Sequence, residues 1–184
     1  VPFLNTSKVT NMSHMFWNCG FINTIPHFDT AKVTDMRNMF AECRGLKTIP
    51  LLDTSNVWTM ERLFYNCWSL EYVPLLNTSK VTNMNTMFWC CYKLITIPKF
   101  DTIKVTDMSY MFYGCESLQS LPTLDTSNVT SIKGIFNSCI SLQSTPLLEC
   151  GKITNADAIF GYSTINTLTD IGGFKDLKIS ITSN

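Results

Sequence analysis

The apolar positions of this chain recur with a period of 24 residues. Three residue types mark the register most clearly, because a phenylalanine, a cysteine and a proline each return at that step. The prolines are Pro2, Pro26, Pro50, Pro74, Pro98, Pro122 and Pro146; the cysteines are Cys19, Cys43, Cys67, Cys91, Cys115 and Cys139; the phenylalanines are Phe16, Phe40, Phe64, Phe88, Phe112, Phe136 and Phe160. A unit this short cannot bury its apolar face alone, so the period predicts a solenoid of stacked units.

A short strand is predicted where a leucine is followed three residues later by an aliphatic residue and then by proline. Leu46, Ile49 and Pro50 form one example. The proline must lie at or just past the strand end, because inside a ladder it would remove a backbone donor. Asp or Asn followed by Thr comes next, as in Asp53-Thr54, and such side chains build turns by bonding nearby amides.

A helix of about two turns is predicted after each turn. Thr34 is well placed to cap its N-terminus in the second unit. The apolar residues there follow the spacing of a helix face rather than that of a strand, and they are Val33, Met36, Met39, Phe40 and Cys43. The predicted fold class is therefore α/β, a right-handed solenoid of strand–turn–short-helix units with a narrow parallel sheet.

The repeated units predict one solenoid domain over residues 1–162. Because Val1 already holds the register position of Ile25, we expect the chain to begin inside a unit. Residues 163–184 break the pattern, with Asp170 where proline is due. We expect this segment to form a C-terminal cap, since a last coil must hide an open face and an unpaired edge.

The overall charge narrows the choice of partners. Lys and Arg together number 14, and so do Asp and Glu. This neutral balance argues against nucleic acid or an anionic membrane surface as the main partner. No apolar run approaches the roughly 20 residues that span a bilayer, so no membrane insertion is expected.

The repeat motif resembles that of a known family. The pattern L-D-T-S-x-V-T-x-M-x-x-M-F-x-x-C-x-x-L-x-x-[IL]-P, seen at residues 101–122 and again from Asp125, is similar to the repeats of BspA-like leucine-rich-repeat surface proteins, in the variant found in mycoplasma lipoprotein-associated repeats. The resemblance covers residues 1 to about 170. It implies a leucine-rich-repeat solenoid on a surface protein with a role in adhesion or partner binding, and it brings no catalytic residues.

Six of the eight cysteines share one register position. Equivalent side chains in a stack point their sulfurs in parallel rather than at one another, which favours buried free thiols over disulfides. A disulfide or a metal site remains an alternative. Cys90 and Cys150 lie outside this ladder, so they are the candidates for thiol reactivity.

The remaining polar residues give no catalytic arrangement. Carboxylates recur at Asp29, Asp53, Asp101 and Asp125. One carboxylate per unit supplies too few oxygens for calcium, so these residues are interpreted as turn caps. His14 and His27 stand alone. We therefore expect no enzyme and no cofactor.

The positions that vary between units are expected to form the outer surface. Many of these positions in the middle units are aromatic, and rigid amphipathic rings suit both protein hot spots and sugar faces. An alternative is that the rings pack against the next unit and shield the helix layer. The candidate ligand-binding residues are Tyr65, Trp68, Tyr72, Trp89, Tyr92 and Tyr113.

Two functions are consistent with these features. The first is a non-catalytic recognition or adhesion module of a surface-exposed protein that binds a host protein or a glycan. The second is a structural spacer or assembly element, for instance in a phage fibre or a surface layer, with self-assembly in a larger complex. The expected location is extracellular or on the cell surface, with a virion surface as the alternative.

Overall fold

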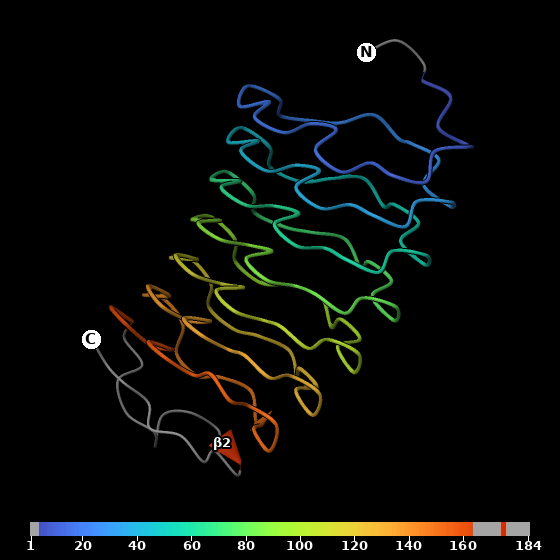
Figure 1. Ribbon diagram of the computed structural model, residues 1–184. Helices are drawn as coiled ribbons and strands as arrows, with labels where there is room; N and C mark the ends of the chain where they lie inside the picture. The colour runs from blue at the N-terminus through green and yellow to red at the C-terminus, as the bar shows by residue number, and fades with distance from the viewer. Residues whose placement is uncertain (1–3, 164–173, 176–184) are drawn as a thin grey trace.

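The computed structural model describes residues 4–163 and 174–175. These residues form a stack of flattened coils, which follow one another in chain order (Figure 1). The phenylalanine rings of successive coils lie on top of one another from Phe16 to Phe160, with centroids 5.5–6.1 Å apart. The stacking of equivalent residues that the period predicts is therefore confirmed.

The core is built by the residues that repeat most strictly. Phe64 and Phe88 have no exposed surface, and the same holds for Cys67 and Leu70. Each coil buries these side chains against the coil before it and the coil after it, so neighbouring coils stabilise one another.

The predicted helices are absent from the described residues, so that part of the predicted fold class is wrong. Residues 36–43 of the second coil form consecutive tight turns instead. Asn38 and Glu42 have φ values of 54° and 64°, and a right-handed α-helix cannot continue through such residues. Two equivalent positions have positive φ in the other coils as well. Thr34 consequently does not cap a helix.

The turn segment, residues 35–45 and their equivalents every 24 residues, carries most hydrogen bonds between coils. In the third coil the amides of Met60, Arg62, Phe64 and Asn66 donate to carbonyls of the next coil at 2.8–3.1 Å. The amides between them close turns inside their own coil, as Tyr65 N does on Arg62 O. One set of alternate amides thus bonds each coil to the next, and the other set closes turns within the coil. The backbone hydrogen bonds of this segment are therefore satisfied without a helix.

The proline segment, residues 46–53 and their equivalents, is not the predicted strand. Its buried residues come every third position, as Leu70, Val73 and Leu76 show in the third coil. This is the period of a polyproline II helix and not the two-residue period of a strand. One backbone hydrogen bond, from Glu71 N to Lys47 O at 2.9 Å, links this stretch to the preceding coil, and Thr54 Oγ1 donates to Asn77 O at 2.9 Å.

Parallel pairing occurs at the start of the turn segment, mostly at one residue per coil. Thr34 donates through its amide and its hydroxyl to Thr10 O, at 2.8 and 3.2 Å. The bridged residues are Asn11, Asp35, Thr59, Asn83, Asp107, Ser131 and Asn155. The predicted parallel sheet is thus reduced to single bridges along most of the stack.

A two-stranded parallel sheet occurs at the C-terminal end of the stack. Strand β1 (Leu148–Glu149) pairs in parallel with β2 (Phe174–Lys175), which is labelled in Figure 1, and Leu148 lies opposite Phe174. Strand β2 is the part of the predicted cap that the structure describes, and most of residues 163–184 lie outside the described ranges.

The predicted role of the aspartates as turn caps is confirmed. Asp29 Oδ1 accepts a hydrogen bond from Ala31 N at 3.1 Å, and Asp53 Oδ1 accepts one from Ser55 N at 3.0 Å. The same geometry occurs at a second register position that we did not anticipate, where Asp35 Oδ1 accepts a bond from Arg37 N at 2.9 Å. Two turns, at Asp29 and at Asp35, are therefore fixed by an Asx side chain in the second coil.

Candidate binding surface

The predicted aromatic residues lie mainly where the turn segment faces outward. Tyr65 and Trp68 flank Asn66 and Cys67 in the third coil. The φ of Asn66 is 57°, and Cys67 points into the core with no exposed surface. The tight turn therefore leaves Tyr65 and Trp68 at the outer edge of the coil.

Three of the predicted residues form one column of stacked rings. The Trp89 ring lies 6.0 Å from the Tyr65 ring and 4.0 Å from the Tyr113 ring, with interplanar angles of 25° and 12°. Tyr110 contacts the Trp89 ring edge-on at 5.2 Å. All four side chains are half-buried. The ring faces are thus largely covered by neighbouring rings, while ring edges remain at the surface.

A second group joins Trp68 to Tyr92 and Arg44. The two rings lie 6.0 Å apart, and the Arg44 guanidinium carbon lies 4.3 Å from the Trp68 ring centroid. Glu42 pairs with Arg44 at 3.0 Å and so holds the guanidinium in place. A cation over an aromatic face stabilises its position, so Trp68 is fixed although 38% of it is exposed.

Tyr92 is also tied to a neighbouring thiol. A hydrogen bond with Cys90 raises the pKa of Tyr92 to about 12. Burial raises the pKa of the Cys90 thiol as well, against the lowering effect of the same hydrogen bond. Both groups are therefore neutral near pH 7, so Tyr92 and Cys90 contribute a hydroxyl and a thiol to this surface and no charge.

Tyr72 does not join the other five predicted residues. It lies on the proline segment, is 51% exposed, and makes no ring contact within residues 4–163.

Sequence reasoning also missed Arg44 and Tyr110. Arg44 holds the same register position as Trp68, which was the available signal. Tyr110 was missed because the predicted helix would have directed its side chain elsewhere. We call the seven residues Arg44, Tyr65, Trp68, Trp89, Tyr92, Tyr110 and Tyr113 the aromatic cluster.

The ladder cysteines are free thiols with a structural partner. Each buried Sγ donates to a phenylalanine carbonyl of the preceding coil, as Cys67 does to Phe40 O at 3.1 Å. Burial raises the pKa of Cys43 and Cys139 to about 12, and it also raises the pKa of the buried cysteines between them well above its usual value. The buried-thiol interpretation is confirmed for these five residues.

The cysteines at the margins of the ladder differ from expectation. Cys19 belongs to the ladder but is exposed. Of the two candidates for thiol reactivity, Cys90 is half-buried, whereas Cys150 is buried and therefore shielded from reagents. Within the described ranges no three His, Cys, Asp or Glu side chains group as metal ligands do. None of the described segments forms a helix long and apolar enough to cross a membrane.

Comparisons with solved structures support the fold. The chain resembles the leucine-rich-repeat protein TpLRR of T. pallidum, with a TM-score of 0.50 and 19% identity over 76% of this chain and 74% of that one. It also resembles a leucine-rich-repeat protein from Eubacterium ventriosum ATCC 27560, with a TM-score of 0.53 and 22% identity over 78% of this chain and 43% of that one. This chain thus spans less than half of the second protein.

Comparisons of sequence identify the family. No curated protein matches the chain. A family model matches it in two overlapping stretches, residues 1–91 and 60–171, and its description is "Mycoplasma protein of unknown function, DUF285". Together with the 24-residue coils and the leucine-rich-repeat fold of the similar structures, this match shows that the chain belongs to the DUF285 family.

Proposed function

We propose that the chain is a non-catalytic recognition module of a surface-exposed protein, and that it binds a partner protein through the aromatic cluster. The observation that carries this proposal is the grouping of six rings and Arg44 on the outside of adjacent turn segments. Tyr, Trp and Arg are the residues most enriched at the energetic centres of protein interfaces.

The ring geometry favours a protein over a glycan as the ligand. A sugar ring stacks on an open aromatic face, but the faces of Trp89 are covered by Tyr65 and Tyr113. Trp68 is likewise covered by Arg44 on one side and contacted by Tyr92. Ring edges, hydroxyl groups and a guanidinium remain for a partner, and these suit the mixed apolar and polar chemistry of a protein surface.

The hydrogen-bonded turn segment also supports this function. Because four amides per coil bond to the next coil in the middle of the stack, the rings project from a framework held in one geometry. A partner that contacts fixed side chains loses less conformational entropy on binding than one that must order them.

The test is to probe an array of purified extracellular proteins and a glycan array with the wild-type chain and with Trp68→Ala. We expect binding to one or more proteins, and we expect the variant to weaken it by about 30-fold, the effect of losing about 2 kcal/mol at a hot spot.

Trp58→Ala is the matched control. Trp58 is 47% exposed and lies beneath Arg37 at 5.7 Å, but it is outside the aromatic cluster. The control should bind like wild type. Binding to glycans alone, or equal losses in both variants, would contradict the proposal. A chain that binds nothing on either array, with only the melting temperature changed by Trp68→Ala, would favour the structural spacer.

A further inference from the structure

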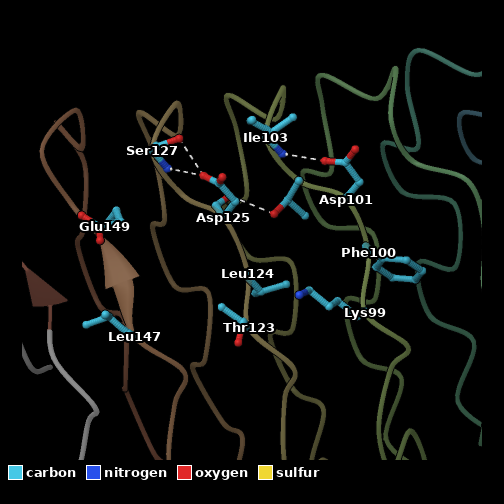
Figure 2. Close-up of a pocket in the computed structure, with 11 residues that line it drawn as sticks. Lys99, Phe100, Asp101, Ile103, Thr123, Leu124, Asp125, Ser127, Leu147 and Glu149 are labelled. Atoms are coloured by element: carbon cyan, nitrogen blue, oxygen red, sulfur yellow. Dashed lines mark hydrogen bonds between the residues drawn. The ribbon is translucent and has the colours of Figure 1, made fainter.

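A second surface feature lies away from the aromatic cluster. A hollow of about 610 Å³ crosses three adjacent coils near the C-terminal end of the stack (Figure 2). Its volume falls within the range of sites that hold a ligand of drug size. It is lined by Lys99, Phe100, Asp101, Thr102, Ile103, Thr123, Leu124, Asp125, Ser127, Leu147 and Glu149.

The floor of the hollow is apolar. Phe100 and Leu124 are buried residues of the proline segment, each 2% exposed. Ile103 and Leu147 flank them with about half of each side chain exposed. The central coil contributes Thr123 at the register position where earlier coils have the bulkier Leu51 and Leu75, and the shorter side chain deepens the surface there.

Carboxylates from three successive coils form one rim. Asp101, Asp125 and Glu149 follow one another along the hollow in Figure 2. Ile103 N donates to Asp101 Oδ1 at 3.2 Å, and Ser127 N donates to Asp125 Oδ1 at 2.9 Å. These bonds fix the carboxylates of Asp101 and Asp125 without neutralising them. The hydrogen bonds from Ser127 hold the pKa of Asp125 below its ordinary value, so this group is ionised at neutral pH.

The lining carries a net negative charge. It contains the three carboxylates and one ammonium group, that of Lys99, which gives −3 + 1 = −2. The core phenylalanine rings of neighbouring coils lie 5.5–6.1 Å apart. This spacing is close to the roughly 6.6 Å between alternate side chains of an extended chain. An extended segment that crosses the coils can therefore place successive cations near successive carboxylates.

We propose that this hollow binds an extended segment of a partner protein in which Lys or Arg alternates with aliphatic residues. The cations pair with Asp101 and Asp125, and the aliphatic side chains cover Leu124 and its neighbours. This site is independent of the aromatic cluster, since the two share no residue, and either can fail without the other.

The test uses isothermal titration calorimetry of the whole chain at low salt with the peptide acetyl-Lys-Leu-Lys-Leu-Lys-Leu-amide. The double variant Asp101→Asn with Asp125→Asn removes two charges from the rim. Asn77 occupies this register position naturally, and its Oδ1 accepts the Ser79 amide at 3.1 Å, so asparagine preserves the turn. We expect the affinity to fall by about two- to tenfold, as for loss of exposed ion pairs.

The matched control is Asp29→Asn with Asp53→Asn, the same change at the same register position outside the hollow. It should leave the affinity unchanged, and Lys99→Met should increase it by removing a like charge. The peptide with Glu in place of Lys should not bind. Absence of binding by the Lys peptide to the wild-type chain would overturn the proposal. So would equal losses in the two double variants, because the attraction would then be general rather than local.

Discussion

The turn segment and the proline segment of each coil solve the same packing problem by different means. Both place apolar side chains in the core, yet the third coil donates four turn-segment amides to its neighbour and links its proline segment to the preceding coil through the amide of Glu71. The turn segment is therefore ordered by directional bonds and the proline segment mainly by apolar burial.

This difference separates the two candidate surfaces. The aromatic cluster projects from turn segments, where the backbone is tied to both neighbouring coils. The hollow lies along the proline segments and the turns that follow them, where side-chain size at one position, that of Thr123, changes the surface relief. The turn segment thus gives the repeat a set of fixed, projecting side chains, and the proline segment gives it a depression whose shape depends on side-chain size.

The largest expected effect tests the packing of the turn segment. Phe88 stacks on Phe64 and Phe112 at 5.5 and 5.8 Å and is fully buried. Phe88→Ala should lower the free energy of unfolding by about 3–5 kcal/mol, because it leaves a cavity and removes the ring contacts with Phe64, Phe112 and Phe100. Leu76→Ala, in the stretch after the proline, should cost about 2–3 kcal/mol.

Urea denaturation of both variants measures this comparison, with Leu75→Ala as the control. Leu75 is 62% exposed, so its truncation should change stability by less than about 0.5 kcal/mol. Equal losses for Phe88→Ala and Leu76→Ala would show that the ring column adds nothing beyond ordinary burial.

A smaller effect is expected from the left-handed residues of the turn segment. Asn38 has a φ of 54°. Asn38→Val places a β-branched side chain in this conformation and should destabilise the protein by about 1–2 kcal/mol. Asn38→Gly, which accepts positive φ without strain, should retain the wild-type stability or exceed it. Thermal denaturation of the two variants checks this, and equal melting temperatures would contradict the turn geometry.

The smallest effect concerns the ion pair at the start of the turn segment. Burial by itself raises the pKa of Asp35, but the hydrogen bonds and charge of Arg37, 2.7 Å away, outweigh it and hold the pKa below its ordinary value. A lowered pKa contributes stability above about pH 4 that is lost as the pH falls through the lowered pKa.

Asp35→Asn tests this contribution, because Asn11 and Asn83 show that asparagine can cap the same turn. The variant should be less stable than wild type by up to about 1 kcal/mol at pH 7, and the two should converge near pH 2. Unfolding by urea at both pH values measures the difference. A gap that persists at low pH would mean that the pair contributes through packing rather than charge.

The sequence predicted the stack and its core because both depend on periodicity alone. Phe64, Cys67 and Leu70 return every 24 residues, so their burial follows from the repeat whatever the local backbone does. The Asx turns were also predictable, since the side chains of Asp29 and its equivalents most readily bond a backbone amide two residues further on.

The local backbone was not predictable in the same way. The consecutive turns bury residues at the spacing of a helix face, so Met36, Met39 and Phe40 carry no signal that separates the two. The positive φ that excludes a helix falls on residues such as Arg62 and Tyr110, and glycine marks it in few coils. The aromatic cluster was found only in part for the same reason, because a helix would have directed Tyr110 elsewhere.

The side-chain hydrogen bonds of the core have a consequence for how such a chain can change in length. Thr102 Oγ1 donates to Asp125 O, 23 residues ahead, and Cys91 Sγ donates to Phe64 O, 27 residues behind. A single residue inserted between these partners would shift the register of every coil beyond it. Threonine and cysteine donors would then both lose their acceptors. Duplication or loss of one complete coil leaves all of them intact. Arrays of this kind can therefore grow or shrink only by whole coils, because the hydrogen bonds of the threonine and cysteine side chains require a fixed number of residues per coil.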